Sequence, residues 1–83
     1  MEKLSEMTYE SVPALWSLRA EIFKNQEIDL SAVKSIDSAG IAFLVQWSKA
    51  LKGQKLKLKN PPLAATNLIA TFALAPLFEI ETK

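Results

Sequence analysis

Residues 28–41 decide the fold, and they read Ile28-Asp29-Leu30-Ser31-Ala32-Val33-Lys34-Ser35-Ile36-Asp37-Ser38-Ala39-Gly40-Ile41. The stretch opens with alternating apolar and polar residues over 27–31, which predicts a strand with one apolar face. It closes with Asp37 and Ser38, both of which offer a capping oxygen to the start of a helix. The apolar spacing that follows predicts this helix over 38–51.

The residues outside this stretch complete an α/β pattern. A second strand is predicted over 55–59, so that strand, helix and strand form a parallel βαβ unit. The remaining predicted elements are helices over 11–24 and 63–74 and a short strand over 77–81. We therefore expect a small parallel sheet with three helices on one face, and we expect Trp16 and Phe72 to point into the core.

The strand over 55–59 reads Lys-Leu-Lys-Leu-Lys, which gives it one apolar and one basic face. A sheet that is covered on one side and exposed to water on the other explains this pattern. The lysines are therefore interpreted as a solvated strand face. A phosphate-binding role for them is the alternative.

The helix over 38–51 carries more apolar surface than one core stripe needs. Gly40, Phe43 and Trp47 widen its apolar arc. Exposed aromatic surface usually marks an interaction site, so this flank is predicted to contact a partner. Burial of Phe43 and Trp47 against the third helix is the alternative.

The amino-acid composition excludes several kinds of site and so limits the possible functions. The chain has 83 residues, a formal net charge of +1, and neither cysteine nor histidine. Disulfides and Cys/His zinc sites are therefore impossible, and the two commonest catalytic side chains at neutral pH are missing. A balanced charge gives no argument for nucleic-acid binding. We expect no enzyme activity, cofactor or metal, and no secretory signal or membrane insertion.

The stretch Asp29-Leu30-Ser31, followed at this spacing by Asp37-Ser38-Ala39-Gly40, resembles the core signature of STAS domains. In that family a strand ends in Asp-Leu-Ser, and Asp-Ser/Thr-x-Gly opens the next helix. The resemblance covers roughly residues 10–75 and implies that residues 1–83 are a single STAS-like domain. STAS domains usually begin with a β-hairpin, but only 3–9 precede the first helix here. The hairpin is therefore expected to be reduced or missing, which leaves a sheet edge available for self-association.

Within the family, the short chain and the helix start Pro13-Ala14-Leu15-Trp16 look most like the MlaB type. That resemblance implies a cytoplasmic accessory subunit, held at the inner membrane by its partner. The partner would be the ATPase of an ABC complex that moves phospholipids and maintains outer-membrane lipid asymmetry. The alternative within the family is an anti-sigma factor antagonist, which binds a kinase-like anti-sigma factor.

The expected partner-binding residues are Asp37, Ser38, Ala39, Gly40, Phe43 and Trp47. In anti-sigma factor antagonists the serine that matches Ser38 is phosphorylated, so the resemblance makes Ser38 a candidate phosphorylation site. The physical reading of the motif agrees with a contact point. A phosphate at a helix start would meet the positive end of the helix dipole, and the absent side chain of Gly40 would let another backbone approach closely.

Overall fold

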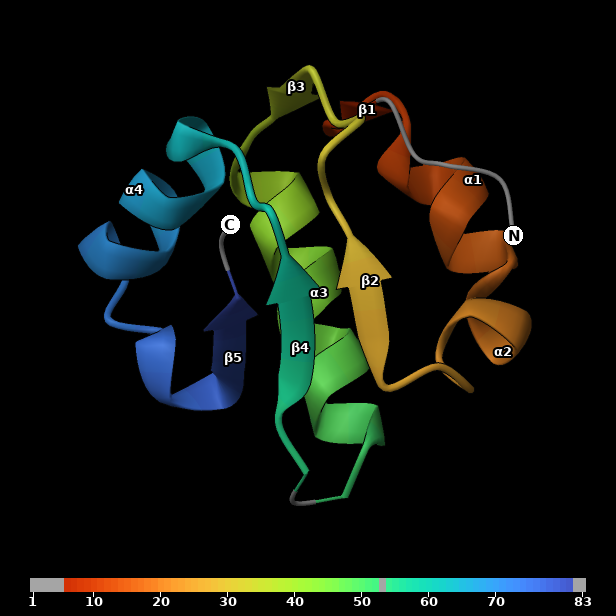
Figure 1. Ribbon diagram of the computed structural model, residues 1–83. Coiled ribbons are helices and arrows are strands. Elements are labelled where there is room, and N and C mark those ends of the chain that lie inside the picture. Colours follow the sequence, from red (N-terminus) through yellow and green to blue (C-terminus); the bar gives the residue numbers. More distant parts are fainter. Residues whose placement is uncertain (1–5, 53, 82–83) are drawn as a thin grey trace.

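The computed structural model describes residues 6–52 and 54–81 (Figure 1). The predicted βαβ unit is confirmed and is formed by β2, α3 and β4. The elements in chain order are β1 (Glu6–Met7), α1 (Val12–Ser17), α2 (Arg19–Ile22), β2 (Glu27–Asp29), β3 (Ser35–Ile36), α3 (Ser38–Ala50), β4 (Leu56–Lys59), α4 (Leu63–Thr71), the 3₁₀ turn η1 (Ala75–Leu77) and β5 (Phe78–Glu81).

The main sheet has three strands in the order β2-β4-β5, and all of them are parallel. A second, smaller sheet pairs β1 with β3 in parallel and places Met7 opposite Ile36. In the described part of the chain, β1 is the one strand that precedes α1. Residues 1–5, where the rest of an N-terminal hairpin would lie, are outside the described residues.

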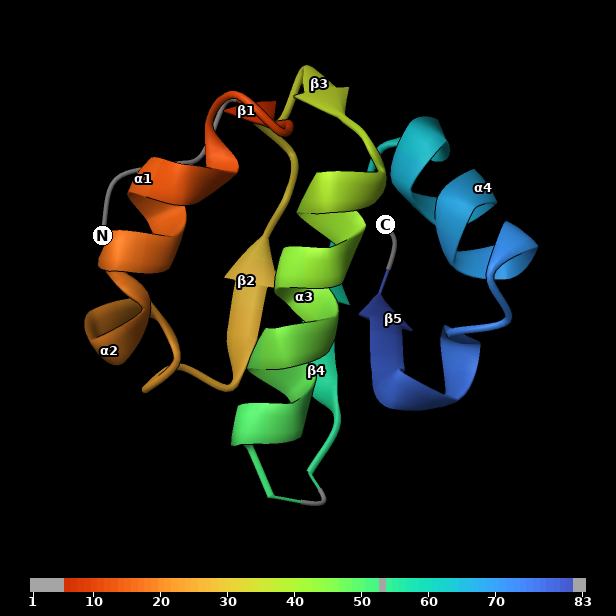
Figure 2. The ribbon, with the colours of Figure 1, turned by 180° about the vertical axis from the view of Figure 1, so that it is seen from behind.

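The helices form one layer on one face of the main sheet, as predicted (Figure 2). In this layer α3 is central, with α1 and α2 on one side and α4 on the other. The opposite face of the sheet is uncovered in the described structure (Figure 1), and the side chains of Lys57 and Lys59 are half-buried.

Two predicted helices are shorter than their patterns indicate. The first is interrupted at Leu18, where the Ser17 hydroxyl and the Arg19 guanidinium donate to carbonyls of the preceding turn. The helix over 63–74 ends at Thr71, because Ala73 adopts a left-handed conformation that closes the helix. The predictions that Trp16 and Phe72 point into the core were wrong. Their exposed fractions are 40% and 50%.

The uncovered face of the sheet is balanced in charge. Lys59 lies 2.8 Å from the Glu27 carboxylate on one side, and Lys57 lies 3.3 Å from Glu81 on the other. The hydrogen bond from Lys59 lowers the pKa of Glu27. This face is thus a solvated surface on which acidic edge strands flank a basic central strand, and the phosphate-binding interpretation loses its support. Acidic edge strands of three and four residues also oppose pairing with a second copy.

Candidate functional site

The start of α3 is held by one carboxylate. Asp37 is the N-cap residue, and its Oδ1 accepts hydrogen bonds from the backbone N–H groups of Ala39, at 2.9 Å, and Gly40, at 3.2 Å. Its Oδ2 accepts a third from the backbone N–H of Tyr9, at 3.0 Å. The sequence offered capping oxygens at both Asp37 and Ser38, and the structure assigns the cap to Asp37 alone. This carboxylate therefore fixes the helix start and the turn after β1 together.

Gly40 is the point where β1 crosses α3. A Cβ atom built at Gly40 would overlap the carbonyl oxygen of Met7 and would lie 2.9 Å from Cγ1 of Ile36. The missing side chain does allow another backbone to approach, as the sequence indicates. That backbone, however, is β1 of the same chain. Gly40 is buried, so its assignment to the partner surface was wrong.

Replacing Gly40 with alanine tests this packing. Alanine favours a helix over glycine by about 1 kcal/mol, so an unobstructed site would gain stability. Here the new methyl group meets backbone, and overpacking of this kind typically costs about 1–3 kcal/mol. We expect Gly40→Ala to lower the melting temperature, measured by circular dichroism. The matched change Ala42→Ser, at an exposed position of the same helix, should have little effect. A higher melting temperature for Gly40→Ala would contradict the close contact.

The pKa of Asp37 is lowered, mainly because the Tyr9 N–H donates to its charged form. The bonds from Gly40 and Ala39 act in the same direction, and desolvation opposes them. A carboxyl group whose pKa is lower in the folded state stabilises the fold above its unfolded pKa. That contribution is lost as the pH falls through the folded pKa.

Asp37→Asn should therefore reduce stability near neutral pH and make the remaining stability less sensitive to acid. Asparagine can still cap the helix through its single carbonyl oxygen, but its NH₂ group cannot accept from Tyr9. Urea unfolding of both proteins between neutral pH and the acid range measures the two effects. Parallel stability curves for the wild type and Asp37→Asn would contradict the role given to this carboxylate.

Ser38 and Ala39 face outward from the same helix start. Ser38 is exposed and Ala39 is half-buried, so these two members of the motif are accessible. Exposed residues continue along α3 at spacings of three and four, the spacing of one helix face. We call this set, Ser38, Ala42, Gln46 and Lys49, the α3 outer stripe. Because these residues are exposed, the stripe lies on the side of α3 that does not pack against the rest of the domain.

Tyr9 lies beside this stripe, and no pattern in the sequence predicts its place there. Its backbone N–H is bonded to Asp37, and its side chain is 71% exposed. The two residues are 28 positions apart, so no local spacing joins them. Only the pairing of β1 with β3 brings the turn after β1 to the start of α3.

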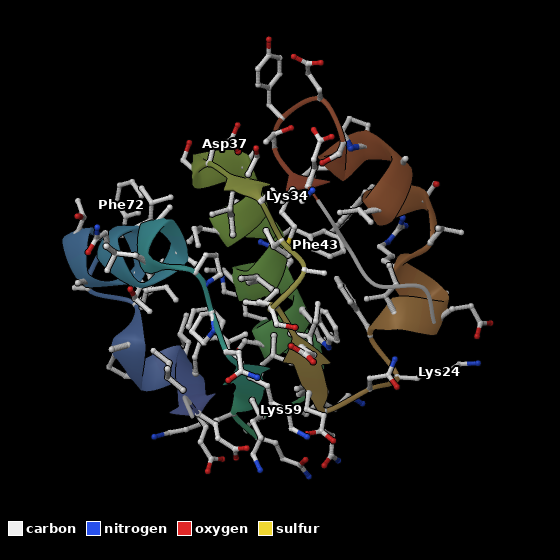
Figure 3. All side chains as sticks on the ribbon, turned by 45° about the horizontal axis from the view of Figure 1, so that its top comes forward. Lys24, Lys34, Asp37, Phe43, Lys59 and Phe72 are labelled. Atoms are coloured by element: carbon white, nitrogen blue, oxygen red, sulfur yellow. The ribbon has the colours of Figure 1, made fainter. Side chains whose placement is uncertain are left out.

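The predicted exposed flank of Phe43 and Trp47 was wrong. Phe43 is 2% exposed and Trp47 is 0% exposed. Both rings pack with Phe23, and Phe43 lies in the interior between α3 and α1 (Figure 3). The indole N–H of Trp47 donates to the carbonyl of Asn25 at 2.9 Å, which fixes the loop that leads into β2. The wide apolar arc of α3 is covered by α1 and α2 and is not a docking flank.

Ser38 is the exposed polar side chain at the start of α3. Within residues 6–52 and 54–81, no cluster of acidic side chains could hold a metal ion. In the same part of the chain, no helix is long and apolar enough to cross a bilayer. An exposed hydroxyl on a rigid, well-capped helix start suits a contact with another molecule.

Comparison with known proteins agrees with the motif. A family model described as Mlab, STAS domain, matches residues 4–79. No curated protein and no solved structure gives a significant match. The match spans nearly the whole chain, so the chain belongs to the STAS domain family.

Proposed function

We propose that this STAS domain is a non-enzymatic accessory subunit that docks on the ATPase of a phospholipid-transporting ABC complex. It would lie in the cytoplasm at the inner membrane, held there by that ATPase. The description of the matching family model supports this choice, since it names the Mlab type. STAS domains are generally interaction modules, which accords with the contact chemistry of the α3 start.

The proposal rests on a difference between the residues of the motif: some have a structural role within the domain and one does not. Asp37 and Gly40 are used inside the domain, where one caps α3 and the other admits β1. Ser38 has neither task and is exposed on the first turn of α3. Along the α3 outer stripe, Ala42 follows Ser38 one turn later, so a partner backbone can approach this face closely.

An anti-sigma factor antagonist is the second candidate, and the exposure of Ser38 favours it as well. A phosphate on Ser38 would lie at the positive end of the α3 dipole, where the domain tolerates it, yet it would obstruct a partner. Gene neighbourhood separates the two proposals, because permease and ATPase genes accompany the first and sigma-factor genes the second.

The test of the first proposal is copurification. The full chain is co-expressed with the ATPase subunit encoded beside it, and the mixture is separated by gel filtration. We expect a stable complex. We also expect a higher melting temperature for the chain in that complex, because a partner that binds only the folded form stabilises it. Failure to coelute with the ATPase, together with binding to a kinase-like anti-sigma factor, would replace the first proposal with the second.

A further inference from the structure

A shallow groove lies between α1–α2 and the second half of α3, outside the motif. Apolar atoms make up the larger part of its lining, which includes a partly exposed Trp16 ring in edge contact with Phe23. We call it the Trp16–Lys49 groove. Its lining residues are Trp16, Ser17, Arg19, Ala20, Phe23, Gln46, Lys49 and Ala50.

The charged residues that line this groove are all basic. Arg19 and Lys49 line it, and no acidic residue does. Among the described residues, Lys24, Lys57 and Lys59 form ion pairs, whereas neither Arg19 nor Lys49 does. The groove therefore offers two cations whose charge is not neutralised within the described chain.

Arg19 is also held in place before anything binds. Its guanidinium lies 4.5 Å from the centre of the Trp16 ring, and Nη1 donates to the Trp16 carbonyl at 2.9 Å. A guanidinium fixed over an aromatic ring keeps further N–H donors for a carboxylate. Such preorganisation reduces the entropy lost on binding.

We infer that the Trp16–Lys49 groove receives an acidic segment of the partner protein. An apolar side chain of that segment would cover Trp16 and Ala50, and its carboxylates would meet Arg19 and Lys49. The inference rests on the proposed function, because the groove continues the α3 outer stripe. Gln46 and Lys49 belong to both, and Ser38 lies only about 16 Å from Lys49 along the helix. One partner can thus contact both surfaces.

An anionic membrane is the competing occupant, and the charges disfavour it. Lipid-binding surfaces of this kind gather about four to eight basic residues. The groove has two, in a chain whose net charge is +1. Two cations beside an aromatic ring match a short peptide with one or two carboxylates better than they match an extended anionic surface.

Photo-crosslinking identifies the occupant. Benzoylphenylalanine replaces Ala50 in the groove or, in a second variant, Ala42 on the α3 outer stripe, and each variant is irradiated in complex with the purified ATPase subunit. We expect both to crosslink to the ATPase. We expect the peptide captured from Ala50 to contain aspartate or glutamate within a few residues of the crosslink.

Crosslinking from Ala42 and from Ala50 distinguishes the groove inference from the proposed function. Crosslinking from Ala42 without crosslinking from Ala50, or capture of a basic segment from Ala50, would overturn the groove inference and leave the proposed function standing. No ATPase crosslink from either position would count against both. Capture of a second copy of the chain from Ala50 would also overturn the inference.

Charge reversal at Lys49, which lies in both the groove and the α3 outer stripe, gives a second readout. Lys49→Glu should weaken ATPase binding roughly tenfold or more, because it places like charges together. Lys55→Glu makes the same change in net charge outside the groove and should leave the affinity unchanged. Equal affinities for both variants would overturn the inference. So would binding of the isolated chain to phosphatidylglycerol vesicles that is lost in Lys49→Glu, because the occupant would then be lipid.

Discussion

Trp47→Ala should destabilise the domain by about 3–5 kcal/mol, the cost of emptying a large buried aromatic site. Trp47 is fully buried, stacks on Phe23 and holds the loop at Asn25 through its indole N–H. Small domains have only about 5–15 kcal/mol of stability in total, so this variant should lose a large share of it. Urea unfolding monitored by circular dichroism measures the loss.

Trp16→Ala is the matched control, because it removes the same side chain from a half-exposed site. Trp16 makes edge contacts with Phe23 and Phe43 but keeps 40% of its surface exposed. We expect a clearly smaller loss of stability. If Trp47→Ala instead melted close to the wild type and failed to bind the ATPase, Trp47 would be an interface residue and its burial in α3 packing would be wrong.

Ser38→Asp should fold normally and bind the ATPase about a hundredfold more weakly. Two effects compete. Within the domain, a carboxylate in the first turn of α3 complements the helix dipole, so the stability should change by less than about 1 kcal/mol. Across an interface, a desolvated charge without a partner costs several kcal/mol. The interface effect is the larger, so affinity and stability should respond separately.

Two further variants show whether the loss of ATPase affinity is caused by the charge added at Ser38. Ser38→Ala removes only a hydroxyl and should bind better than Ser38→Asp. Lys59→Ala alters the uncovered face of the sheet, on a different side of the molecule from the start of α3 (Figure 3), and should bind like the wild type. Equal affinities of the wild type and Ser38→Asp in calorimetric titration would return Ser38 to a purely structural position in the helix.

The fold could be predicted from the sequence because its signals are local. The predicted helix over 38–51 is α3 to within one residue, since a capping residue and a regular apolar period define it. The predicted strands over 27–31, 55–59 and 77–81 overlap β2, β4 and β5, and β2 ends two residues earlier than predicted. The capping role of Asp37 could also be predicted, whereas Asp29 is the last residue of β2, where its Oδ1 accepts from the Ser31 N–H.

The surface of the site was harder to predict because it depends on contacts between distant segments. The apolar arc of α3 is wide, and the sequence alone does not show that α1 and α2 would cover Phe43 and Trp47. Likewise, Gly40 reads as a place for close approach, but only the path of β1 shows that Met7 occupies it. Tyr9 joins the site through the same path. Local patterns thus locate the helix start, while tertiary packing decides which of its residues remain exposed.

We propose the α3 outer stripe as the docking surface, and backbone amide NMR locates that surface residue by residue. The ¹⁵N-labelled chain is titrated with the unlabelled ATPase subunit, and signal changes are mapped onto the domain. We predict the largest changes at Ser38, Ala42, Gln46 and Lys49, with β4 unaffected. The largest changes at Lys57 and Lys59, on the uncovered face of the sheet, would contradict the claim.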